Sequence, residues 1–195
     1  IILLVAVFSG FSQNIQIDGI KNLKNTGIKA ITTGESDEVH GYYTYYRIEK
    51  SAKGMRTFQF AIVDKDVKTV VKADIVIHKN AVINNTVFNG KRFLISWDDR
   101  KNKKSVFKII DDKGKVVKTK EIPVEKKFQV GTVVYPMSNG EGFYIARKEF
   151  GKKVVGYSIE KIDNNLKQIW KKDQIPAVGK KSVKGLINTA TRFAV

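Results

Sequence analysis

Asn89-Gly-Lys-Arg-Phe-Leu-Ile-Ser-Trp97 is the stretch from which the fold of this 195-residue chain can be read. Its Asn-Gly pair tolerates the positive φ of a tight hairpin turn and leads into a run of apolar and aromatic residues. A second run, Val106-Phe-Lys-Ile-Ile110, follows a basic loop. Neither run alternates cleanly between apolar and polar residues, so both are predicted to be strands covered on both faces.

The same pattern returns about every 50 residues along the chain. The aromatic residues that open the second strand of successive units are Tyr42, Phe93, Phe143 and Phe193. The turns expected before the first three are His40-Gly41, Asn89-Gly90 and Asn139-Gly140. The Asp-led turns expected about twenty residues later are those at Asp64, Asp112 and Asp163. An Ile-Pro pair closes two of the units, at Ile122-Pro123 and Ile175-Pro176.

Each unit is therefore predicted to be a four-stranded antiparallel meander in an all-β protein. The unit bounds are residues 34–83, 84–132 and 133–188, with the start of a fourth unit at 189–195. One such sheet cannot bury both of its faces alone, and stacked four-stranded sheets with this period are typical of β-propeller blades. We expect residues 13–195 to form the N-terminal part of an incomplete β-propeller-like domain. The alternative is a β-sandwich.

In spacing and strand pattern the chain resembles secreted bacterial β-propeller proteins of unknown function. The marked propeller signatures are missing: Trp97-Asp98 occurs once, after a second strand, and does not match the repeated Trp-Asp signature. Aspartate-box repeats are absent as well. The resemblance therefore implies an architecture and no particular chemistry.

The N-terminus has the composition of a secretory signal peptide. Ile1–Phe8 is continuously apolar, and Gly10 and Ser12 occupy the small-residue positions of a cleavage site, which predicts a signal at residues 1–12. The run is shorter than the roughly 20 apolar residues of a membrane-spanning helix. We expect an exported protein (periplasm, cell surface or secreted) with no transmembrane segment in the mature chain. A buried N-terminal strand is the alternative.

The net charge of +17 does not predict nucleic-acid binding. Lys supplies 30 of the 36 basic residues, and these lysines are spread along the whole chain. Arg, which forks onto phosphates and base edges, is scarce. The charge fits solubility or an acidic extracellular partner better.

No residue pattern indicates catalysis, a metal or a cofactor. His40 and His78 have neither Cys neighbours nor helical His spacing, and the Asp-led turns run into lysines instead of further oxygen ligands. Asp98-Asp99 is a paired carboxylate, as glycosidases require. We expect these two acids to be exposed in a basic loop, where they are poor candidates.

One set of equivalent positions is predicted to bind a ligand. Four residues beyond each marker aromatic lie Tyr46, Trp97 and Arg147, and the loops that follow carry Arg100 and Lys148. In a propeller these five residues lie around one face, where stacking and basic groups suit an acidic glycan or a partner protein. The alternative is that Tyr46 and Trp97 pack between blades.

These observations favour an exported, non-catalytic binding or interaction protein whose ligand the sequence does not identify. Two further functions remain open from the sequence alone. One is the N-terminal part of a carbohydrate-active enzyme, and the other is a structural repeat of a surface assembly.

Overall fold

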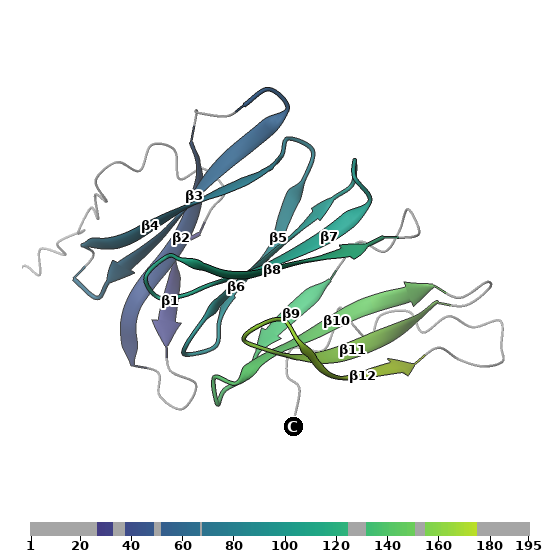
Figure 1. Ribbon diagram of the computed structural model, residues 1–195. Helices are drawn as coiled ribbons and strands as arrows, with labels where there is room; N and C mark the ends of the chain where they lie inside the picture. Colours follow the sequence, from purple (N-terminus) through teal and green to yellow (C-terminus); the bar gives the residue numbers. More distant parts are fainter. Residues whose placement is uncertain are drawn as a thin grey trace, which may run out of the picture.

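The computed structural model describes residues 27–32, 38–48, 52–66, 68–124, 132–150 and 155–174, and these are β-strands joined by turns (Figure 1). The strands form three separate four-stranded sheets, each an antiparallel meander. The predicted signal peptide at residues 1–12 and the start of a fourth repeat at 189–195 lie outside the described residues.

The strands follow the chain in order within each sheet. The first sheet contains β1 (Lys29–Thr32), β2 (Val39–Ile48), β3 (Met55–Asp64) and β4 (Thr69–His78). The second contains β5 (Val82–Phe88), β6 (Phe93–Asp99), β7 (Lys104–Ile110) and β8 (Val116–Pro123). The third contains β9 (Val133–Pro136), β10 (Gly142–Phe150), β11 (Val155–Asp163) and β12 (Gln168–Gln174). The predicted all-β fold of repeated four-stranded meanders is confirmed, and a propeller-like arrangement is compatible with it.

The prediction of a turn at His40-Gly41 is wrong, because both residues lie within β2. Gly41 faces Asp64 across the β2–β3 ladder. A Cβ atom on Gly41 would lie 2.5 Å from the Val63 carbonyl oxygen. The glycine is therefore needed for close strand approach and not for a turn. The first sheet also begins at Lys29, ahead of the predicted repeat start at residue 34.

One turn is repeated in all three sheets between the third and fourth strands. Its leading Asp accepts a hydrogen bond from the backbone N–H of a Lys four residues later. The pairs are Asp64 with Lys68 at 2.9 Å, Asp111 with Lys115 at 2.8 Å, and Asp163 with Lys167 at 2.8 Å. In the second sheet the leading residue is Asp111 and not the predicted Asp112. Asp111 directly follows the end of β7, and it is the carboxylate of Asp111 that accepts the hydrogen bond from Lys115. The repeat is thus a repeat of local turn chemistry.

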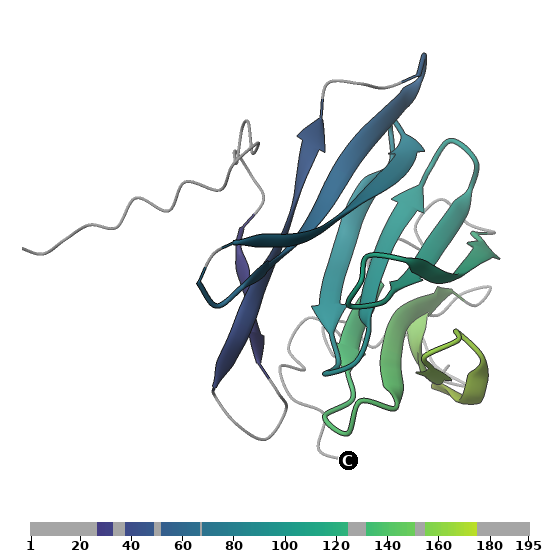
Figure 2. The ribbon, with the colours of Figure 1, turned by 60° about the vertical axis from the view of Figure 1, so that its left-hand side comes forward.

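The sheets stack face to face, with the second sheet between the other two (Figures 1 and 2). The first core layer joins the first and second sheets, and at its centre the rings of Tyr43 and Phe93 lie 5.3 Å apart, edge to face. The second layer joins the second and third sheets and includes Leu94, Phe107 and Phe143. Every residue of β6 is buried, which confirms the expectation of strands covered on both faces.

The three marker aromatics occupy equivalent register positions. Tyr42, Phe93 and Phe143 each pair with the residue before a turn aspartate, namely Val63, Ile110 and Ile162. Phe93 and Phe143 are 1% and 0% exposed because they point toward the preceding sheet. Tyr42 is only half-buried, since it lies on the face of the first sheet opposite the one that packs on the second sheet.

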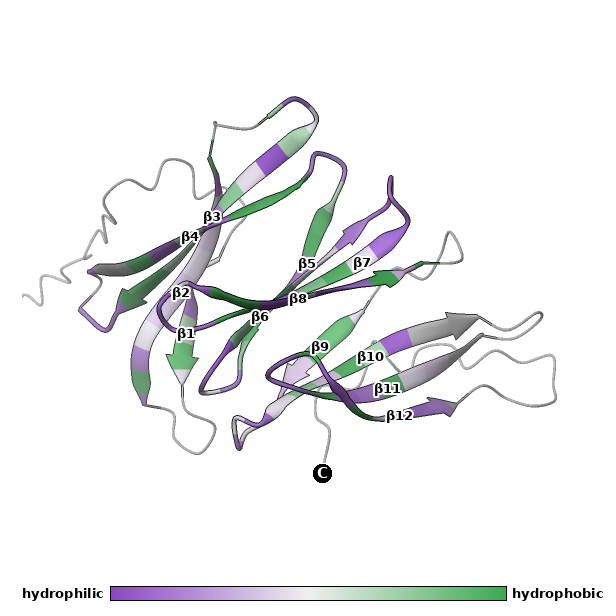
Figure 3. Cartoon of the chain, viewed as in Figure 1, coloured by the Kyte–Doolittle hydropathy of each residue, from purple (hydrophilic) through white to green (hydrophobic). Residues whose placement is uncertain are grey.

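Hydrogen bonds link the first strand of the second sheet, β5, to both neighbouring sheets. The Tyr43 hydroxyl donates to the Thr86 carbonyl oxygen of β5 at 2.9 Å, and Lys29 Nζ donates to the same oxygen at 3.1 Å. Asn85 Nδ2 of β5 donates to the Thr132 carbonyl oxygen next to β9 at 2.9 Å. The last strand of the third sheet is polar, and Figure 3 draws β12 mostly in purple.

Replacing Phe93 tests the stacking directly. Phe93→Ala should lower the free energy of unfolding by about 3–5 kcal/mol, because it empties the centre of the first core layer. Tyr42→Ala, at the equivalent register position of the first sheet, should cost clearly less. Urea unfolding followed by circular dichroism measures both, and equal losses would contradict the assigned faces.

Tyr43 should make the protein sensitive to high pH. Burial, and secondarily the neighbouring Tyr45, raise the pKa of Tyr43 from 10.0 to about 12. The folded state therefore favours the neutral phenol. Its contribution to stability is full below pH 10 and is lost as the pH rises toward 12. Between about pH 9 and about pH 11 the native chain should lose more stability than Tyr43→Phe. Urea unfolding at each pH measures the free energy of unfolding of both proteins. An equal dependence on pH in the native chain and in Tyr43→Phe would contradict this role of Tyr43.

Candidate ligand-binding surface

The three predicted ring residues occupy equivalent positions but do not meet. Tyr46, Trp97 and Arg147 pair with Gln59, Val106 and Ser158 in their respective sheets. Each is on the sheet face that carries the marker aromatic. The structure therefore distributes them over three separate layers and does not gather them around one opening.

The two aromatic members are buried. Trp97 is 6% exposed and belongs to the first core layer, where Lys108 Nζ lies 5.4 Å from the centre of its ring. Burial lowers the pKa of Lys108. Tyr46 is 1% exposed and donates a hydrogen bond to Gln59 Oε1. Burial and the nearby Asp74 raise the pKa of Tyr46. These contacts support packing roles for both aromatics, and their role in ligand binding stays a prediction.

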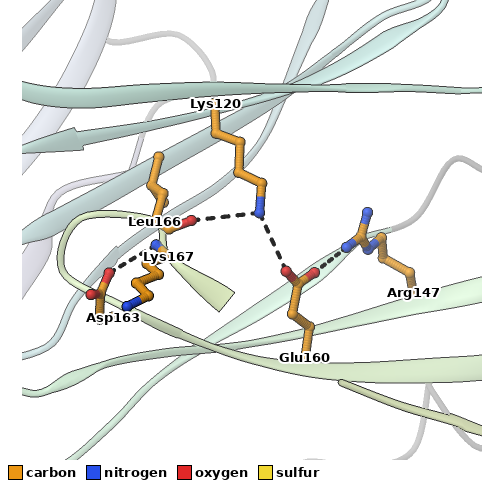
Figure 4. Close-up of polar contacts among 6 residues, drawn as sticks. All are labelled: Lys120, Arg147, Glu160, Asp163, Leu166 and Lys167. Carbon is orange, nitrogen blue, oxygen red and sulfur yellow. Dashed lines mark hydrogen bonds and ion pairs between the residues drawn. The ribbon is translucent and has the colours of Figure 1, made fainter. Parts of the chain in front are cut away.

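Arg147 takes part in an ion-pair cluster between the second and third sheets (Figure 4). Its guanidinium binds Glu160 Oε2 of β11, and Glu160 is 2% exposed. Lys120 Nζ of β8 lies 3.4 Å from Glu160 Oε1 and 3.5 Å from the Leu166 carbonyl oxygen. The cluster fastens the edge strand of one sheet to the hairpin of the next.

Arg100 is the exposed member of the predicted set. It lies in the β6–β7 turn, which Asp99 holds by accepting hydrogen bonds from Asn102 N at 3.1 Å and Asn102 Nδ2 at 2.6 Å. Lys148 lies in β10 opposite Tyr157. The turn presents Arg100 to solvent.

Asp98 and Asp99 are not in an exposed loop as expected, because both end β6 and are 6% and 5% exposed. Asp98 accepts hydrogen bonds from Asn84 Nδ2 and from Ser105 Oγ, each at 2.6 Å. Asp99 is engaged by Asn102, as described above. Their oxygens thus hold the β6–β7 hairpin and join it to β5. The described residues contain no group of three or more His, Cys, Asp or Glu side chains placed to bind a metal ion.

Sequence reasoning missed a row of aromatic residues across the third sheet. The β9–β10 and β10–β11 ladders pair Tyr144 with Tyr135 and with Lys161, and the β11–β12 ladder pairs Lys161 with Trp170. The four residues stand side by side on the face opposite the second core layer, and we call this set the outer row. Only the strand register reveals it, because the four residues come from four different strands.

The outer row borders a hollow of about 360 Å³, next to the β9–β10 turn. Its lining residues are Tyr135, Pro136, Met137, Ser138, Asn139, Tyr144 and Lys161. The rings of Tyr144 and Trp170 lie 6.0 Å apart, and Trp170 is 36% exposed. Lys172 Nζ lies 5.7 Å from the Trp170 ring centre. The surface combines ring faces with two ammonium groups.

The fold and surface define a class: an all-β protein of stacked four-stranded meanders with an aromatic and basic row on one outer face. Within that class, the chain belongs to a family of proteins of unknown function, DUF6770, whose model matches residues 1–171. No curated protein matches it.

Two solved structures, both variants of the apocarotenoid oxygenase of Synechocystis, are similar to part of this chain at 12% identity. Their TM-scores are 0.42 and 0.41, and each match covers 69% of this chain. The chain spans about a third of the length of these proteins, 35% in both cases. Among the described residues no helix is long and apolar enough to cross a membrane.

The ion-pair cluster gives a stability prediction. Glu160→Gln leaves Arg147 and Lys120 without their carboxylate, so unfolding free energy should fall by about 3 kcal/mol. The matched control is Glu121→Gln. It breaks the more exposed pair with Lys104, 2.7 Å long, and should change stability by at most about 1 kcal/mol. Chemical unfolding measures the loss of unfolding free energy in both variants. Equal losses would show that the cluster does not fasten the sheets.

Proposed function

We propose that this protein is an exported, non-catalytic binding protein built from propeller-like blades, with its ligand site at the outer row. The observation that carries the proposal is the hollow of about 360 Å³ beside Tyr135, Tyr144 and Lys161. A hollow with apolar ring faces and a few polar groups is the usual form of a small-ligand site.

The state of the carboxylates supports binding over catalysis. Glycoside hydrolysis needs two acids that face a substrate across a cleft. Asp98, Asp99 and Glu160 are buried and bound to neighbouring side chains, so none of these three acids faces the hollow. These three acids therefore do not provide the catalytic pair that the alternative of a carbohydrate-active enzyme requires.

An exported location is part of the proposal and rests on the apolar start of the sequence. The chain expressed with residues 1–12 in a bacterial host should be recovered outside the cytoplasm, without those residues. Cell fractionation and mass spectrometry of the recovered N-terminus measure this. Recovery of the uncleaved chain in the cytoplasm would contradict export and leave the binding proposal standing.

Binding without turnover is the central expectation. The protein should retain a ligand from a broad panel of glycans, and mass spectrometry should find the retained ligand chemically unchanged. Trp170→Ala should weaken retention by roughly tenfold, because stacking on an aromatic ring contributes about 1–1.5 kcal/mol. Trp97→Phe, a conservative change in the core, should leave retention unchanged. Release of shortened glycans would contradict the proposal that the protein is non-catalytic.

A further inference from the structure

We propose that the outer row takes a saccharide carrying an acidic group, and that Lys161 selects for that acid. This proposal rests on the proposed function, since it names the ligand class of the same site. It goes beyond that function in assigning the selecting residue and the charge of the ligand.

The strand register singles out Lys161. It pairs with Tyr144, as Ile109 pairs with Leu94 in the second sheet and Ile62 pairs with Tyr43 in the first. Both isoleucines are buried in the core layers, because in those sheets this face is covered by the next sheet. The repeat therefore places a cation at a position that is apolar in the two covered sheets.

Among the described residues, the ammonium group of Lys161 has no acidic partner. The residues beside it in the outer row are Tyr144 and Trp170, neither of which carries a negative charge. In the described part of the chain no acidic side chain forms an ion pair with Lys161. By contrast, Lys120, at another position of the equivalent face, binds Glu160 of the next sheet. An acidic group on a ligand can therefore bind Lys161 without displacing an acid of the described residues.

The rings on either side suit a sugar. Trp170, 36% exposed, and the half-buried Tyr135 offer flat apolar surfaces, against which the C–H face of a pyranose packs, whereas Tyr144 is only 9% exposed. Ser138 and Asn139 line the hollow with hydrogen-bonding groups. A carboxylate or sulfate on the sugar would then meet the ammonium of Lys161, with Lys172 adding positive charge beside Trp170. The competing occupant is a further sheet of the same chain, which would have to bury Lys161.

The test compares acidic glycans with their neutral counterparts on an array that includes uronic-acid, sialic-acid and sulfated members. The native protein should bind acidic members selectively. Lys161→Ile should weaken that binding at least about tenfold, the loss expected for one charge-assisted hydrogen bond. Because isoleucine occupies the equivalent position in the other two sheets, the variant is expected to fold. Lys115→Ile makes the same change at an exposed turn residue and should bind like the native chain.

Trp170 reports on the site independently. The chain has two tryptophans, so Trp97→Phe leaves Trp170 as the single fluorophore. Acrylamide should quench it, and a bound acidic glycan should protect it. A Trp170 that acrylamide cannot reach without ligand would show that another part of the chain covers the face, and would overturn the proposal.

The remaining outcomes separate the two proposals. Equal binding of neutral and acidic glycans, or unchanged acid preference in Lys161→Ile, would overturn the acidic-ligand inference and leave the binding function intact. Failure of every glycan to bind would overturn the acidic-saccharide inference and would also count against a glycan-binding function. Loss of binding in Lys115→Ile as well would show a general charge effect in place of a site.

Discussion

Burial of both faces of the second sheet is the constraint on which the rest of the structure depends. Its central strands β6 and β7 carry large apolar side chains on both faces, Phe93 and Ile110 toward the first sheet, Leu94 and Phe107 toward the third. At about 25 cal/mol per Å² of apolar surface removed from water, such a sheet is stable only between two others. The neighbouring sheets are therefore part of the fold and not accessories to it, as in other stacked repeats.

Apolar burial alone does not fix how the sheets are aligned, because it has no direction. Polar groups between the sheets supply that alignment. Asn89 is 3% exposed and donates from Nδ2 to the Gly142 carbonyl oxygen at 3.1 Å and to Asn164 Oδ1 at 2.8 Å, which joins two hairpins of adjacent sheets. Lys120 of β8 makes a second contact between the same two sheets, with Glu160. A shift between the sheets would leave these buried groups unpaired at a cost of about 1–3 kcal/mol each.

The fold was predictable because its signals are local and repeated. Asp turns, Asn-Gly turns and unbroken apolar runs recur at one spacing, and each has a short-range physical cause. The site was harder to predict. Counting from the marker aromatics found equivalent positions correctly. In stacked sheets, however, equivalent residues lie at the same place in different sheets and do not surround one opening, and Trp97 is buried between two of these sheets. Tyr135, Tyr144, Lys161 and Trp170 come from four strands, so their juxtaposition depends on the register of three ladders, one of which shifts next to Lys161.

The repeat gives a way to separate structural from functional positions without homologous sequences. Where one register position is apolar in covered sheets and charged in another, packing cannot explain the charge, and the local environment must be considered. Lys108 and Glu160 occupy a different register position, which is charged in both the second and the third sheet; Trp97 lies beside the first charge, and Arg147 with Lys120 neutralises the second. Lys161 differs from both, because the outer row surrounds it with rings and no described acid pairs with it. This difference between Lys161 and the other two charged residues is the ground on which we propose an acidic ligand at the outer face of the third sheet.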